Sequence, residues 1–141
     1  MRFLLLAFAL TSFAHASTIQ EQLAQLDGRS GDFQVFVNGK ENEYHRGNCS
    51  IRFDAEYNQL TIENSLSDVF VSIDSLKPAG VNTYRTDSTG RRVGGDACGD
   101  FGGMSGYKQT LTLKGNVLQV RTQFRCWMVE KNDLIDSCTL H

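Results

Sequence analysis

The glycine-rich stretch from residue 87 to 105 carries the densest group of side chains that could contact a ligand or partner. It contains six of the chain's 13 glycines, together with carboxylates, an aromatic ring and a thioether. A loop of this length in a compact domain is usually functional, and glycine leaves backbone amides accessible. The alternative is a mobile hairpin connection that is tethered only for resistance to proteases. On the functional interpretation, we expect ligand or partner contacts from Asp96, Asp100, Phe101, Met104, Ser105 and Tyr107.

Residues suited to catalysis or metal binding are scarce. His45 lies in a polar stretch where nothing singles it out, and His141 is the last residue. The run 103–107 resembles a nucleophile elbow but lacks its final glycine and lies in a strand-rich region. Asp96 and Asp100 lack the alternating acidic ladder of a calcium loop. We therefore expect no enzyme activity, no metal and no cofactor.

The first sixteen residues have the pattern of a secretory signal peptide. Arg2 provides a short basic start, residues 3–13 are mostly apolar, and Ala14-His15-Ala16 has the small-x-small form of a cleavage site. The apolar run is shorter than the roughly 20 residues that a spanning helix needs. We expect cleavage before Ser17, a periplasmic or secreted location, and a single domain over residues 17–141.

All four cysteines lie in the expected mature domain, and an even number in an exported chain indicates two disulfides. If the last hairpin turns near residues 131–133, Cys126 lies directly opposite Cys138, at a separation that suits a disulfide. That register predicts a Cys126–Cys138 bond and, by elimination, a Cys49–Cys98 bond that tethers the glycine-rich loop. A Cys49–Cys138 bond would instead place an early strand beside the last one.

The composition argues against some classes of partner. The chain carries 16 acidic and 14 basic residues, a formal net charge of −2, whereas nucleic acids and anionic membranes attract a basic face. After the signal, no apolar stretch is long enough to cross a membrane. We expect a monomer with no nucleic-acid partner and no membrane span, which binds a small apolar ligand or an extracytoplasmic protein.

A short helix is expected over residues 18–27. Thr18 and Glu21 have the spacing of a capping box, and apolar residues recur on one helical face after them. Asp27-Gly28 is a typical stop signal. A helix of about ten residues is marginal alone, so it must pack on the rest of the domain.

From residue 32 onward, apolar and polar residues alternate, which is typical of strands with one buried face. Three hairpins have registers that leave short turns and place apolar residues opposite one another. These registers pair Phe53 with Leu60, Ile62 with Val69, and Leu113 with Leu118. About eight strands are expected, near 32–38, 48–54, 59–63, 68–74, 80–86, 106–113, 117–130 and 134–140.

An antiparallel meander of about eight strands with one apolar face must hide that face. Closure into a small barrel does so and removes exposed strand edges, so the predicted fold is all-β with lipocalin-like architecture. The alternative is a two-sheet β-sandwich. A barrel of this size is either filled by its own side chains or holds one small ligand.

Two sets of side chains have two interpretations each. Trp127, with the outward arginines of the same strand, forms either a partner surface or a hydrophobic seat for the N-terminal helix, and we favour the seat. Polar residues also occupy inward positions of the expected barrel. These residues are Gln109, Thr122 and Asp136. They either line a ligand cavity or lie at the solvent-accessible end of a packed interior.

The expected architecture resembles that of the lipocalins, which combine export, a short helix before the barrel, a meander and disulfides. The Gly-x-Trp signature of that family is not met, because Gly31-Asp32-Phe33 stands in the first strand. Ser105-Gly106 is similar to the Ser-Gly of the loop that exported bacterial lysozyme inhibitors insert into their enzyme. No family is assigned on these features.

The function expected from the sequence is that of an exported, non-enzymatic binding protein. Its disulfide-tethered glycine-rich loop would lie at the barrel mouth and bind a small apolar ligand or a partner. The alternative is a proteinaceous inhibitor of an extracytoplasmic enzyme such as a lysozyme or a protease.

Overall fold

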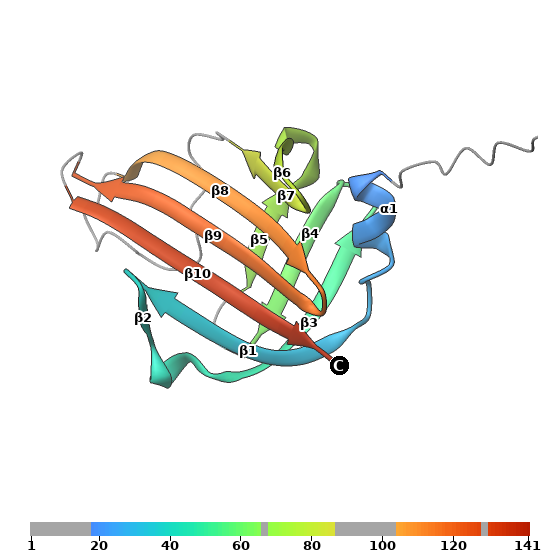
Figure 1. The fold of residues 1–141 in the computed structure, drawn as a ribbon, viewed down its shortest axis with the longest axis horizontal. Helices are drawn as coiled ribbons and strands as arrows, with labels where there is room; N and C mark the ends of the chain where they lie inside the picture. The colour runs from blue at the N-terminus through green and yellow to red at the C-terminus, as the bar shows by residue number, and fades with distance from the viewer. Residues whose placement is uncertain (1–17, 66–67, 87–103, 128–129) are drawn as a thin grey trace, which may run out of the picture.

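The computed structural model describes residues 18–65, 68–86, 104–127 and 130–141. These residues form one ten-stranded antiparallel sheet that curls into a half-barrel, with one short helix (Figure 1). The all-β prediction with a barrel-like sheet is therefore confirmed, and the strands form one continuous sheet where the sandwich alternative required two. The predicted signal peptide lies outside the described residues. Within the described ranges, no helix is long and apolar enough to cross a membrane.

The helix α1 spans Ile19–Ala24, and two short 3-10 helices, η1 and η2, span Glu43–His45 and Ile73–Ser75. The strands are β1 Ser30–Val37, β2 Lys40–Glu41, β3 Gly47–Asp54, β4 Gln59–Asn64, β5 Val69–Ser72, β6 Lys77–Gly80, β7 Thr83–Thr86, β8 Met104–Lys114, β9 Val117–Cys126 and β10 Glu130–Leu140.

The sheet runs from an edge strand, β5, through the long central strands to a second edge strand, β6. Across the sheet the order is β5-β4-β3-β1-β10-β9-β8-β7-β6, with β2 paired to β1. The first long strand therefore lies beside the last, and the sheet ends at β5 and β6, which are joined in sequence through η2. All four residues of β6 are exposed, and Pro78 in this strand has no N–H to donate, which suits an edge strand.

The three short hairpins have the registers predicted from their apolar pattern. In each pair the two apolar residues lie opposite one another on antiparallel strands. This register is specified because a slip by one residue would move the apolar side chains of a strand from the core to solvent. The confirmed pairs are Phe53 with Leu60, Ile62 with Val69, and Leu113 with Leu118.

The N-terminal helix is shorter than expected but begins as predicted. The Thr18 hydroxyl accepts a hydrogen bond from the Glu21 N–H at 3.2 Å, and the Glu21 carboxylate accepts one from the Thr18 N–H at 2.9 Å. Leu23 in the helix and Leu26 directly after it pack into the main core, which holds the helix at one end of the half-barrel (Figure 1). The expectation that Trp127 seats the helix is wrong, since that side chain is 57% exposed and lies outside this core.

The predicted disulfide pairing is wrong. Cys49 in β3 is bonded to Cys138 in β10, with their Cα atoms 6.0 Å apart. The last hairpin turns directly after β9, earlier than expected, so Cys126 lies opposite Glu130. Cys126 is itself disulfide-bonded, whereas Cys98 lies outside the described residues. The observed bond is the one that accompanies an early strand lying close to the last.

Gly31 marks a sharp bend in the sheet between β3 and β10. Strands separated by a third strand are roughly 9–10 Å apart in a flat sheet, twice the usual spacing, yet Cys49 and Cys138 are bonded across β1. Gly31 pairs with Cys49 on one side and with Leu140 on the other. A Cβ on Gly31 would lie 2.0 Å from the Thr139 carbonyl oxygen, so only glycine allows the two backbones to approach this closely.

Candidate functional site

A band of buried polar residues crosses the concave face of the sheet. Thr86, Gln109 and Thr122 lie side by side on β7, β8 and β9, and they are 2%, 4% and 0% exposed. Asp136 on β10 lies one inward position further from the β9–β10 turn, opposite Val120. We call Thr86, Gln109, Thr122 and Asp136 the polar belt.

Thr122 is buried with an unsatisfied hydroxyl. Among the described residues, its Oγ1 is the one side-chain oxygen or nitrogen that is completely hidden from solvent and has no hydrogen-bond partner. Leaving such a group unpaired costs roughly 1–3 kcal/mol, and the hydroxyl can both donate and accept. A valine of similar shape would avoid this cost, so packing alone does not account for threonine here.

Asp136 places a carboxyl group among apolar side chains. It is 7% exposed and lies between Val35 on β1 and Val120 on β9. In the described part of the chain, its carboxyl group has no ion pair or hydrogen bond. Desolvation by burial raises its pKa from 3.8 to about 6. At neutral pH the fold therefore holds a buried carboxylate without a cation, which is unfavourable unless something pairs with it.

The other two members of the polar belt have partners. Gln109 extends from β8 toward the opposite edge of the sheet, where its Nε2 donates a hydrogen bond to the Phe70 carbonyl oxygen on β5 at 3.0 Å. This contact joins the two sides of the half-barrel near its open edge. Thr86 also has an interaction partner. Within the described residues, the polar groups of the belt that lack a partner are therefore those of Thr122 and Asp136.

A small apolar cluster borders the polar belt on the side of the β9–β10 turn. Tyr107, Phe124 and Cys126 are its buried members, and Leu134 packs against them. The register of β8 against β9 shifts between residues 105 and 108, and such a bulge changes the direction of neighbouring side chains. The main core lies on the other side of the belt. A ligand at the belt would thus have polar contacts in the middle and an apolar wall beside them.

The strands that flank the glycine-rich segment end beside this small cluster. Thr86, the last residue of β7, pairs with Gln109, and Met104, the first residue of β8, pairs with Cys126. The described strands therefore deliver both ends of residues 87–103 to the same end of the half-barrel.

Of the six predicted contact residues, the structure describes the side chain of Tyr107 alone. Asp96, Asp100 and Phe101 lie outside the described residues, and Met104 and Ser105 are placed only through their backbone in β8. Tyr107 is 4% exposed in the small cluster. Its side chain faces the interior, where a bound small molecule could reach it, and not an external protein.

An open groove between β1, β3 and β4 contains a carboxylate that already has partners. The groove has a volume of about 550 Å³ and is lined by Ser30, Gly47, Asn48, Cys49, Ser50, Glu63, Asn64 and Ser65. Its one carboxylate, Glu63, accepts a hydrogen bond from the Ser50 hydroxyl at 3.2 Å and pairs with Arg52 at 3.0 Å. The groove therefore contains a carboxylate that already has partners, unlike Asp136.

The described ranges contain no group of three metal-ligating side chains. His45 lies in η1, and within these ranges its side chain has no hydrogen bond or ion pair that would orient it as a base. Comparison with protein-family models gives no match, and comparison with characterised proteins gives none either. The function therefore has to be argued from the site itself.

The sequence pattern identified three of the four residues of the polar belt, but not which of their polar groups lack a partner. The strand period placed Gln109, Thr122 and Asp136 on the inward face and left two interpretations open. Thr86 was missed because its strand was short and its partner strand lies beyond the glycine-rich segment. Which of these groups lack partners depends on the contacts between β5 and β8, which the alternation of residues does not encode.

Proposed function

We propose that this protein is an exported, non-enzymatic binding protein whose concave face holds a small amphipathic amine. The observation that carries the proposal is the buried Asp136 carboxyl group, which has no cation near it in the described residues, beside the unpaired Thr122 hydroxyl. Thr122 is paired with Leu134, two residues from Asp136, so Thr122 and Asp136 are diagonal neighbours, whose Cα atoms are roughly 7–8 Å apart. One ligand head group can contact both at that separation.

The chemistry of the two groups selects the head group. A carboxylate only accepts hydrogen bonds, so it favours a ligand that donates them, and a protonated amine also supplies the missing positive charge. The Thr122 hydroxyl accepts a further N–H. The apolar part of the ligand would then lie against Tyr107 and Phe124 in the small cluster. This division into a polar head and an apolar body is usual for small-molecule sites.

The glycine-rich loop remains part of the proposal. Thr86 and Met104, the described residues on either side of it, lie next to the polar belt and the small cluster. A binding role for Asp96, Asp100 and Phe101 stays a prediction.

Three ligands with the same eight-carbon chain test the head-group preference: octylamine, octanol and octanoate. Isothermal titration calorimetry at neutral pH should give the tightest binding for octylamine and the weakest for octanoate. Asp136→Asn should weaken octylamine binding by roughly 10–100-fold, since a hydrogen bond to a charged group contributes about 1.5–3 kcal/mol. Octylamine binding to the unaltered protein should also weaken below about pH 6, where Asp136 becomes protonated.

The matched control is Glu56→Gln, which removes one negative charge from an exposed turn. It should leave octylamine binding unchanged. Equal binding of octylamine and octanoate, or an Asp136→Asn protein that binds octylamine normally, would refute the proposed site. If none of the three compounds binds, while the protein inhibits a lysozyme or a protease in a direct assay, the inhibitor alternative gains support.

A further inference from the structure

The convex face of β8, β9 and β10 carries a group of cationic side chains. Outward residues alternate with the buried ones on these strands, and the registers place Lys108, Arg125 and Lys131 near one another. All three are exposed. We call these three residues the basic strip. The strip is opposite in sign to the chain, whose formal net charge is −2.

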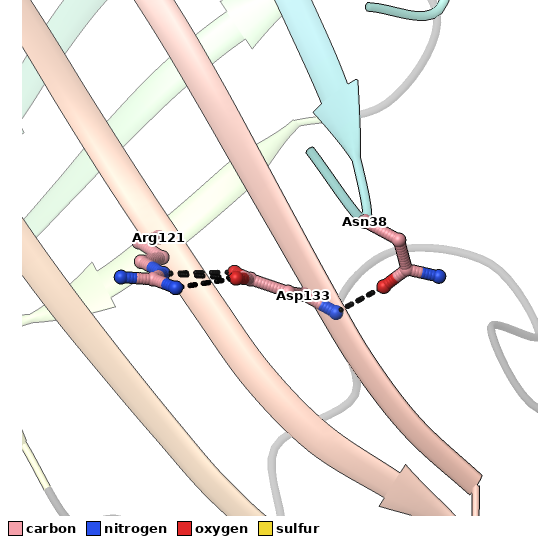
Figure 2. A network of polar contacts seen from close by, with 3 residues as sticks. All are labelled: Asn38, Arg121 and Asp133. Atoms are coloured by element: carbon pink, nitrogen blue, oxygen red, sulfur yellow. Dashed lines mark hydrogen bonds and ion pairs between the residues drawn. The ribbon is translucent and has the colours of Figure 1, made fainter. Parts of the chain in front are cut away.

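Among the described residues, the basic strip has no acidic partner. Asp133 is the one acidic residue on the outward face of these three strands among the described residues, and it is already occupied. Figure 2 shows its carboxylate accepting hydrogen bonds from Arg121, with Nε–Oδ1 at 2.9 Å, while its N–H donates to Asn38 Oδ1 at 2.9 Å. That network raises the pKa of the Arg121 guanidinium and joins β9, β10 and the end of β1.

Within the strip, like charges face each other. Arg125 lies directly opposite Lys131 on the neighbouring strand, an arrangement that destabilises a sheet. In the described part of the chain, none of the three cations has an ion pair, and none has another partner. Within the described residues nothing offsets this repulsion, so a negatively charged partner would bind favourably there.

An exposed tryptophan borders the basic strip. Trp127 follows Arg125 by two residues, directly after β9, and is 57% exposed. Its φ of +55° lies in the left-handed region, which a bulky side chain rarely adopts and which costs about 1–3 kcal/mol. Tryptophan and arginine are the residue types most enriched at the energetic centres of protein interfaces.

We propose that the basic strip and Trp127 form a docking surface for an acidic segment of another exported protein. A partner with clustered carboxylates would neutralise the opposed Arg125 and Lys131 and would cover the indole ring. Discrete acidic segments suit this surface better than long polyanions or anionic bilayers, because the remainder of the chain is net acidic and repels an extended negative partner. This surface lies on the opposite side of the sheet from the polar belt, so either proposal can fail alone.

The only tryptophan of the chain reports directly on this surface. Titration with a short polyglutamate peptide, which represents a discrete acidic segment, should shift the emission of Trp127, and the affinity should fall as salt is raised. The double variant Arg125→Ala, Lys131→Ala should bind polyglutamate roughly tenfold more weakly, a change of about 1.4 kcal/mol. The control is Lys40→Ala, Lys77→Ala, which removes two exposed cations from β2 and β6 and should bind normally.

Two further probes separate the classes of partner: vesicles containing phosphatidylglycerol and a short DNA duplex. Neither should bind as tightly as polyglutamate at the same salt concentration. Tighter binding of either probe through Arg125 and Lys131 would overturn the proposed partner class. Equal loss of polyglutamate binding in the control variant, or an unchanged Trp127 emission on binding, would overturn the surface itself.

Discussion

Replacing Asp136 by asparagine should change how the stability of this protein depends on pH. Burial raises the pKa of Asp136 from 3.8 to about 6, so the folded state holds this proton more tightly than the unfolded state does. The associated stability is fully present below about pH 4 and is lost as pH rises through about 6. The shift of roughly two units corresponds to about 3 kcal/mol of unfolding free energy. Asparagine does not titrate, so the variant should not suffer this loss.

Urea unfolding at several pH values between 4 and 8 measures the effect. The difference in unfolding free energy, variant minus unaltered protein, should grow from pH 4 and level off above pH 7, with a total change of about 3 kcal/mol. The change with pH is the informative quantity, because any packing penalty of the buried amide is the same at every pH. Glu56→Gln provides the comparison for loss of one surface charge and should show no such growth. A difference that stays constant from pH 4 to 8 would mean that the Asp136 carboxyl is solvated in the native state and would refute the proposed amine site.

Two other changes test the bend of the sheet. Gly31→Ala places a Cβ 2.0 Å from a backbone oxygen and should lower the unfolding free energy by more than about 3 kcal/mol or prevent folding. The control Gly47→Ala meets only ordinary contacts and should lower it by less than about 0.5 kcal/mol. Equal unfolding free energies of the two variants in urea would contradict the bend. Replacing both Cys49 and Cys138 by alanine should cost about 4–5 kcal/mol in the chain-entropy model, since the bond closes a loop with a sequence separation of 89 residues. An unchanged urea midpoint under oxidising conditions would show that the bond adds nothing to a bend already fixed by packing.

The registers of the short hairpins could be predicted from sequence because local rules decide them. Phe53 and Leu60 flank a four-residue turn, and Leu113 and Leu118 flank a turn that contains Gly115, whose φ is +60°. In each case a slip by one residue would expose the apolar face, so the alternation permits one answer. The capping box at Thr18 was predictable for the same reason, since both partners lie within one turn.

The register of the last hairpin could not be predicted in this way. The expected partner of Cys126 was Cys138 and the observed one is Glu130, a shift by an even number of residues. An even shift keeps every side chain on its original face, so the apolar pattern does not distinguish the two registers. The observed turn also requires Trp127 at a positive φ, which residue preferences argue against. Because this register was predicted wrongly, the disulfide pairing and the exposure of Trp127 were predicted wrongly too.

The pairing of β1 with β10 has a consequence for how the chain acquires its structure. β1 and β3 are among the first segments made, yet the strand that lies beside β1 and carries the bonding partner of Cys49 follows every other strand in sequence. Contacts between residues so far apart are slow to form, because the intervening chain must first be brought together. A chain that emerges from its N-terminus therefore cannot complete this sheet until β10 is available, and Cys49 remains an unpaired thiol until then.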